Sequence, residues 1–69
     1  MIPWYFEYAP SSNSTEIIYV TVLQKFKQHY TGLTMYRVRE ESSIGWVAEH
    51  IYGEAYIRNI LNNRVEGSS

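Results

Sequence analysis

The chain has 69 residues, no cysteine and a net charge of −1. This length allows one domain, with a core that supplies only about 3–5 kcal/mol, and the lack of cysteine excludes disulfides and thiolate metal sites. The near-neutral charge leaves no basic face for phosphates, so nucleic acid is not an expected partner. No run approaches a bilayer span and no secretory signal is evident. We therefore expect no membrane contact and a location in a cytoplasm, or in a particle assembled there.

Aromatic residues make up 16% of the chain, with two Trp, seven Tyr and two Phe. Tyr and Trp are enriched at protein interfaces, and a core this small cannot bury all of these rings. Without disulfides or metal, the chain gains stability most readily by burying surface against a partner or a second copy of itself. We therefore expect aromatic contacts with other protein subunits. The alternative is that the rings fill the core.

In chain order, the first expected element is a strand over residues 4–8, which lies between Pro3 and Pro10. Because proline cannot donate to a ladder, this strand is expected at a sheet edge. Aromatic side chains on an edge strand offer apolar surface beside unpaired backbone groups. The candidate partner-binding residues are therefore Trp4, Tyr5, Phe6 and Tyr8.

The next segment, residues 16–30, has two interpretations. Residues 17–22 form a β-favouring run, which would make a hairpin with the first strand across a serine-rich turn. As a helix, the same region places its apolar side chains on one arc, and residues 23–30 are expected to be helical in either case. The pattern slightly favours one helix over residues 14–30 that ends at Gly32.

Residues 33–39 alternate between the two faces of a strand, and Ser42 or Ser43 then provides a helix cap. From residue 44 the apolar period becomes helical, and Gly53 interrupts it. We therefore expect two short helices that meet at Tyr52 and Gly53, with these two residues as a structural turn and with positive φ at the glycine.

The sequence offers little that indicates catalysis. No glycine-framed nucleophile or phosphate loop is present, and the serines cluster in expected turns and near the C-terminus. His50 and Glu54 have the spacing of a weak metal pair, but the favoured interpretation is a solvated pair on a helix. His29 fits a helix C-terminus. We therefore expect no enzyme activity, no metal and no cofactor.

The expected helix pair has two interpretations. In a helix-turn-helix, the second helix would present Arg58, Asn59 and Asn62 to base edges. The alternative starts from the order Met35-Tyr36-Arg37-Val38, then Val47-Ala48 and Tyr52-Gly53, then Ile60-Leu61 and Asn63. This order over residues 35–64 resembles a LysM module. The resemblance implies a strand and two helices, with Tyr52 and Gly53 holding the helix turn.

The N-terminal half extends this resemblance. An aromatic-proline segment over residues 4–10 and an apolar-basic segment over residues 20–27 precede the module. Together they resemble the small LysM-containing baseplate wedge subunits of contractile-tailed phages, which implies a structural assembly protein. LysM modules also bind cell-wall sugars, but Glu40-Glu41-Ser42-Ser43 replaces the usual glycine-aspartate turn, which argues against a sugar site here.

The sequence thus predicts one α+β domain over residues 1–69, with a two- or three-stranded sheet and two or three helices. Residues 1–32 form its strand and helix segment, residues 33–64 its LysM-like part and residues 65–69 a flexible tail. The expected function is non-catalytic protein–protein interaction, most concretely as a phage tail baseplate-type subunit. The alternatives are a small phage-encoded inhibitor of a host enzyme and a helix-turn-helix DNA-binding module.

Overall fold

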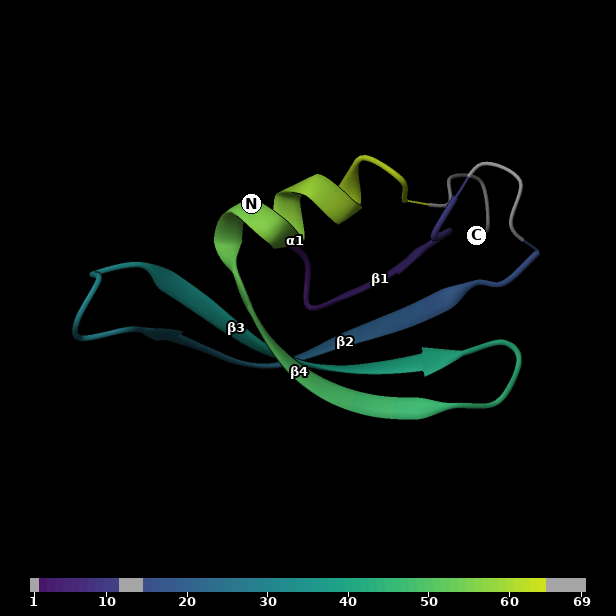
Figure 1. Ribbon diagram of the computed structural model, residues 1–69, viewed down its shortest axis with the longest axis horizontal. Helices are drawn as coiled ribbons and strands as arrows, with labels where there is room; N and C mark the ends of the chain where they lie inside the picture. Colours follow the sequence, from purple (N-terminus) through teal and green to yellow (C-terminus); the bar gives the residue numbers. More distant parts are fainter. Residues whose placement is uncertain (1, 12–14, 65–69) are drawn as a thin grey trace.

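A computed structural model of the chain describes residues 2–11 and 15–64. It contains a four-stranded antiparallel sheet in the order β1-β2-β3-β4, followed by a helix (Figure 1). The elements are β1 (Tyr5–Tyr8), β2 (Ile18–Lys27), β3 (Thr34–Ser42), β4 (Val47–Gly53) and α1 (Glu54–Leu61). Consecutive strands are neighbours throughout, so local hairpins build the whole sheet. The expected tail at residues 65–69 lies outside the described residues.

The first hairpin confirms the edge strand and decides between the two interpretations of residues 16–30. β1 pairs with β2 in an antiparallel register that places Phe6 opposite Val20. The helix expected over residues 14–30 is wrong, because β2 occupies most of this range. The β-branched run gains a partner strand on each side, and tertiary pairing of this kind overrides a helical apolar arc.

The second hairpin joins β2 to β3, and its turn includes Gly32 with a positive φ of 70°. His29 lies in this turn and not at a helix C-terminus. The register of β2 shifts between Val22 and Gln24, which makes Leu23 the extra residue of a bulge. β3 confirms the strand predicted from alternation, with Tyr36 and Val38 buried on one face and Arg37 exposed on the other.

The third hairpin overturns the helix expected from residue 44. β4 pairs with β3 over seven residue pairs, from Glu41 opposite Val47 to Met35 opposite Gly53. The turn between them contains Gly45, whose φ of 115° favours glycine. The long, strongly alternating β3 offers a second edge, and pairing there outweighs the weak helical period of residues 44–55.

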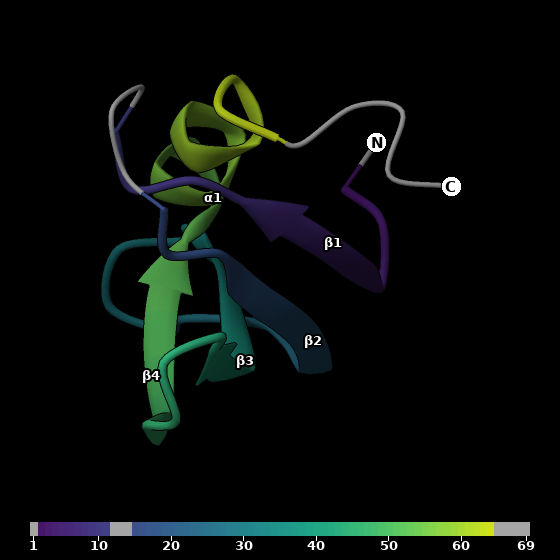
Figure 2. The same cartoon turned by 90° about the vertical axis from the view of Figure 1, so that its right-hand side faces the viewer.

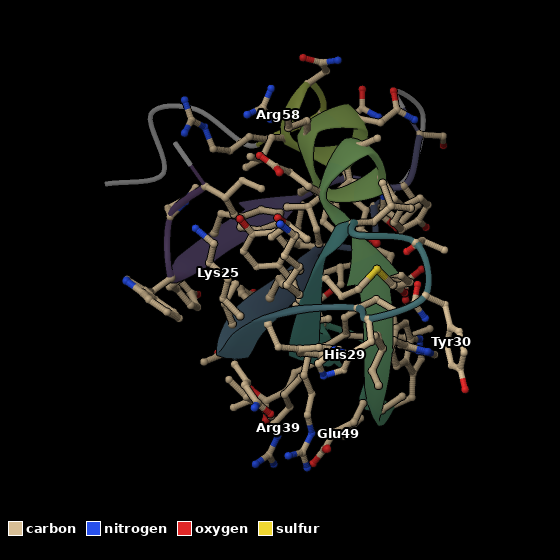
Figure 3. All side chains as sticks on the ribbon, turned by 90° about the vertical axis from the view of Figure 1, so that its left-hand side faces the viewer. Lys25, His29, Tyr30, Arg39, Glu49 and Arg58 are labelled. Carbon is tan, nitrogen blue, oxygen red and sulfur yellow. The ribbon has the colours of Figure 1, made fainter. Side chains whose placement is uncertain are left out.

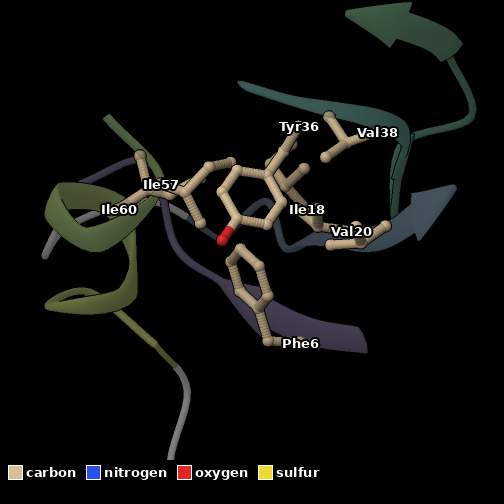
Figure 4. Packing of buried hydrophobic residues seen from close by; sticks show 8 residues of the cluster. Phe6, Ile18, Val20, Tyr36, Val38, Ile57 and Ile60 are labelled. Carbon is tan, nitrogen blue, oxygen red and sulfur yellow. The ribbon is translucent and has the colours of Figure 1, made fainter. Parts of the chain in front are cut away.

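The core lies between the sheet and α1, which covers one face (Figure 2). The helix begins directly after β4, with Gly53 as its N-cap, and it buries Ile57 and Ile60. The Tyr36 ring lies between Ile57 of α1 and Phe6 of β1 (Figure 4). The buried set contains Phe6, Ile18, Val20, Val22, Tyr36, Val38, Ile57 and Ile60.

The predicted fold class is therefore wrong. The described residues form a mostly β domain with four strands and one helix, where we expected a smaller sheet with a helix pair. The segment that carried the LysM-like and helix-turn-helix interpretations forms β3, β4 and α1, so its first expected helix is a strand. Neither helix-pair geometry is present in this segment.

Candidate binding surface

The outer edge of β4 has unpaired backbone groups. The Ser42 amide donates a hydrogen bond to the Trp46 carbonyl at 2.9 Å, which fixes the phase of the β3–β4 ladder. Hydrogen-bonded pairs alternate along an antiparallel ladder, so the backbone groups of Val47, Glu49 and Ile51 point away from β3. Among residues 2–11 and 15–64, no strand pairs with this edge. It is therefore open to a fifth strand.

The face of the sheet opposite α1 adds side chains to this edge. Val47 and Ile51 are more than half exposed on β4, with Glu49 between them. Arg37 of β3 donates to Glu49 at 2.8 Å, and both side chains are about half exposed. Arg39 and Glu49 lie on the side away from Arg58 and α1 (Figure 3). The surface thus has an ion pair in the middle and one apolar position on each side of it. We call Val47, Glu49 and Ile51 the β4 edge site.

The β3–β4 turn extends the apolar surface. Ile44 is largely exposed, and Trp46 is partly exposed. The Trp46 indole Nε1 donates to Glu16 at 2.8 Å, and Ser42 donates its hydroxyl to the same carboxylate oxygen. These bonds fix the indole at one end of the edge site, where its remaining surface faces solvent.

A buried carboxylate lies on the helix side of the sheet. Glu40 is 3% exposed. Its Oε2 accepts a hydrogen bond from the Tyr8 hydroxyl at 3.1 Å, and its Oε1 accepts one from Tyr52 at 2.9 Å. Burial is the main cause that raises the pKa of both tyrosine hydroxyls, and the Glu40 carboxylate raises it further. His50 Nε2 also lies 3.3 Å from Oε1.

This cluster stabilises the fold and shows no assembled nucleophile. Both oxygens of Glu40 accept hydrogen bonds from tyrosine hydroxyls, so the buried side chain is satisfied. The buried Ser42 donates to Glu16 and not to His50. A hydrolytic triad requires a nucleophilic serine or threonine hydroxyl that is hydrogen-bonded to the histidine. Within the described parts of the chain, His50 has no such hydroxyl beside it.

The four expected partner-binding residues do not share one surface. Trp4 is 64% exposed on the helix side of the sheet, where it lines a pocket. Tyr5 is exposed on the opposite face and donates to Glu7 at 3.0 Å. Phe6 is 4% exposed in the core, and Tyr8 is the half-buried donor to Glu40. Alternation along β1 separates these side chains.

The expected structural turn lies where β4 meets α1. Tyr52 is in β4 and packs against Tyr56 of the helix, with ring centroids 4.3 Å apart. Gly53 caps α1 with φ −73°, so the expected positive φ is wrong. His50 lies beside Glu40, whereas Glu54 accepts from Arg58 at 2.7 Å. Each residue of the expected His50–Glu54 pair therefore has a different partner.

Sequence reasoning missed Val47 and Ile51 as surface residues because it placed them on the buried stripe of a helix. The signal that identifies them is the combination of β-branched side chains with the turn residue Gly45, which is typical of a hairpin. Residues 2–11 and 15–64 contain no group of three or more His, Cys, Asp or Glu side chains placed to bind a metal. The same residues contain no helix with the length and hydropathy of a bilayer span.

The fold and the surface define a small antiparallel β-meander with one face covered by a helix and one edge open. No family model, curated protein or solved structure matches the chain.

Proposed function

We propose that the protein is a non-catalytic protein–protein interaction module that accepts an extended segment of a partner protein along β4. The observation that carries this proposal is the phase of the β3–β4 ladder, which directs the backbone groups of Val47, Glu49 and Ile51 outward. Strand addition at an open edge uses such groups for affinity and the alternate side chains for specificity.

The side chains around the edge define the chemistry of the partner segment. A strand that pairs with β4 places every second side chain on the open face, beside Val47 and Ile51. Apolar partner residues fit opposite these two positions. Glu49 lies between them and is paired with Arg37, so a polar or basic partner residue fits opposite it. We therefore expect a β-forming segment with the order apolar, polar or basic, apolar at alternate positions.

The more specific prediction, a phage tail baseplate-type subunit, stays a prediction from the resemblance. The helix pair that carried that resemblance is replaced by a strand and a helix. The β4 edge supports protein interaction without reference to it. A second copy of the chain is one occupant that the edge admits, and concentration-dependent association would identify it.

The proposal is tested with peptides selected from a random displayed library on the immobilised protein. Glu49→Pro removes one outward amide and leaves the β3–β4 ladder intact, since proline is tolerated on a free edge. It also removes an exposed ion pair, which contributes about 0–1 kcal/mol. Ile51→Glu removes an apolar contact and keeps every backbone group.

We expect both variants to stay folded and to weaken the selected peptides at least tenfold. The matched control is Tyr30→Ala, which changes an exposed residue in the β2–β3 turn and should bind as the original chain does. Strand addition would be refuted if the selected peptides bound all three variants with equal affinity. It would also be refuted if the peptides shifted protein amide signals only away from β4.

A further inference from the structure

A small pocket lies on the face of the sheet that α1 covers, near the start of this helix. It has a volume of about 240 Å³ and is lined by Ile2, Trp4, Val22, Lys25, Tyr36 and Glu54. Val22 and Tyr36 belong to the buried core and form its base. Trp4 is largely exposed, so its indole offers a free aromatic face at the wall. The pocket is separate from the β4 edge site.

The Tyr36 hydroxyl has no hydrogen-bond partner among residues 2–11 and 15–64, although the residue is only 5% exposed. Among these residues, every side-chain nitrogen or oxygen that is fully shielded from solvent has a hydrogen-bond partner. The Tyr36 hydroxyl therefore has some solvent-accessible surface. Tyr36 is one of the residues that line this pocket. An acceptor bound in the pocket can accept a hydrogen bond from this hydroxyl, which has no partner among the described residues.

Lys25 adds a positive charge to the lining of the same pocket. It projects next to β1, below α1 (Figure 3), and it makes no ion pair within the described part of the chain. Glu54 also lines the pocket, but its carboxylate accepts from Arg58 at 2.7 Å.

We propose that this pocket binds an aromatic carboxylate, with its ring against Trp4 and its carboxylate between Lys25 and the Tyr36 hydroxyl. Apolar walls with a few convergent polar groups are the usual composition of a small-ligand site. The volume admits one ring with a short acid group. Two sources present this chemistry, a free small molecule and the C-terminal aromatic residue of a polypeptide.

Phenylacetate is the probe, and its titration is followed by amide shifts. Phenylacetamide and phenethylamine are matched probes that keep the ring and lose or reverse the charge. We expect phenylacetate to shift the amide signals of the pocket residues with a dissociation constant in the millimolar range. The other two probes should bind at least tenfold more weakly, because they lack the carboxylate that makes charge-assisted hydrogen bonds. Equal binding of all three probes would overturn the proposal, as would shifts confined to other surfaces.

Four variants separate the roles of the lining residues. Lys25→Met should weaken phenylacetate about tenfold or more, and Tyr36→Phe about threefold to tenfold while it keeps the buried ring. Glu54→Gln should tighten binding, since it removes a like charge. Lys27→Met is the control: it lies two residues along the same strand and does not line the pocket. Lys25→Met and Lys27→Met with equal affinity would contradict the site.

The two sources are distinguished with a short peptide that ends in phenylalanine, with a free or an amidated C-terminus. Tighter binding of the free-acid peptide than of phenylacetate assigns the pocket to a polypeptide C-terminus. Equal or weaker binding assigns it to a free small molecule. Both results retain the aromatic carboxylate chemistry. This site is independent of strand addition at β4, so Glu49→Pro should leave phenylacetate binding unchanged.

Discussion

The hydroxyl of Tyr52 donates a 2.9 Å hydrogen bond to Glu40, which joins the edge strand β4 to a buried carboxylate of β3. Tyr8 donates to the other oxygen from β1. Glu40→Ala should lower the free energy of unfolding by about 2–4 kcal/mol, since it leaves two hydroxyls unpaired and opens a cavity. Glu40→Gln, which keeps the shape and one acceptor, should cost about 1–2 kcal/mol. Chemical denaturation measures both, and equal losses would contradict the network.

The same hydrogen bonds predict an alkaline loss of stability. Burial raises the pKa of Tyr8 and Tyr52 above the ordinary value of about 10. The unfolded chain therefore releases these protons at a lower pH than the folded chain. The stabilisation is complete below pH 10 and is lost as pH rises through the folded pKa. Melting temperatures should fall above about pH 10, and the double variant Tyr8→Phe with Tyr52→Phe should show a flatter decline. An unchanged decline would refute the assignment.

Two glycines predict opposite responses to alanine. Gly45 has φ +115°, a backbone conformation that strains any L side chain although no atom lies within 4 Å of an added Cβ. Gly53 has φ −73°, and an added Cβ would meet only the Met35 sulfur at 3.9 Å. Gly45→Ala should lower stability by about 1–2 kcal/mol, whereas Gly53→Ala should be neutral or slightly stabilising. Thermal unfolding of the two variants compares them directly, and the reverse order would contradict the hairpin geometry.

Two isoleucines distinguish the core from the edge site. Ile57 of α1 is fully buried against the sheet, and Ile51 is more than half exposed on β4. Ile57→Ala should lower the free energy of unfolding by about 2–4 kcal/mol. Ile51→Ala should change it by less than about 1 kcal/mol and should weaken strand partners instead. A large stability loss from Ile51→Ala would mean that the open face is covered.

The sequence was most informative where the pattern had only one physical solution. Strict alternation identified β3, and the prolines around residues 4–8 placed β1 at an edge. The strand interpretation of residues 17–22 was available from β-branched propensity but competed with an equally regular helical arc. The local sequence pattern cannot decide between the strand and the helix, because the free energy that favours the strand comes from pairing with β1 and β3.

The larger error concerned β4. Ile44, Val47, Ala48, Ile51 and Tyr52 recur at helical spacing, yet the strand exposes Val47 and Ile51 and turns Tyr52 toward Glu40. Periodicity alone cannot distinguish an apolar residue on an exposed face from one in the core. The sequence therefore did not reveal the β4 edge site. Because its apolar residues were assigned to the buried stripe of a helix, the sequence analysis predicted a helix pair. Trp4 was named as a binding residue, but its pocket needs Lys25 and Tyr36 from strands distant in sequence.

Amide hydrogen exchange along β4 tests the open edge most directly. In the dilute protein, the amides of Ala48, His50 and Tyr52 should be protected by the ladder, whereas those of Val47, Glu49 and Ile51 should exchange rapidly. A bound strand should then protect the second set. Uniform protection along β4 in the monomer, or the opposite alternation, would contradict an open edge and with it the proposed binding function.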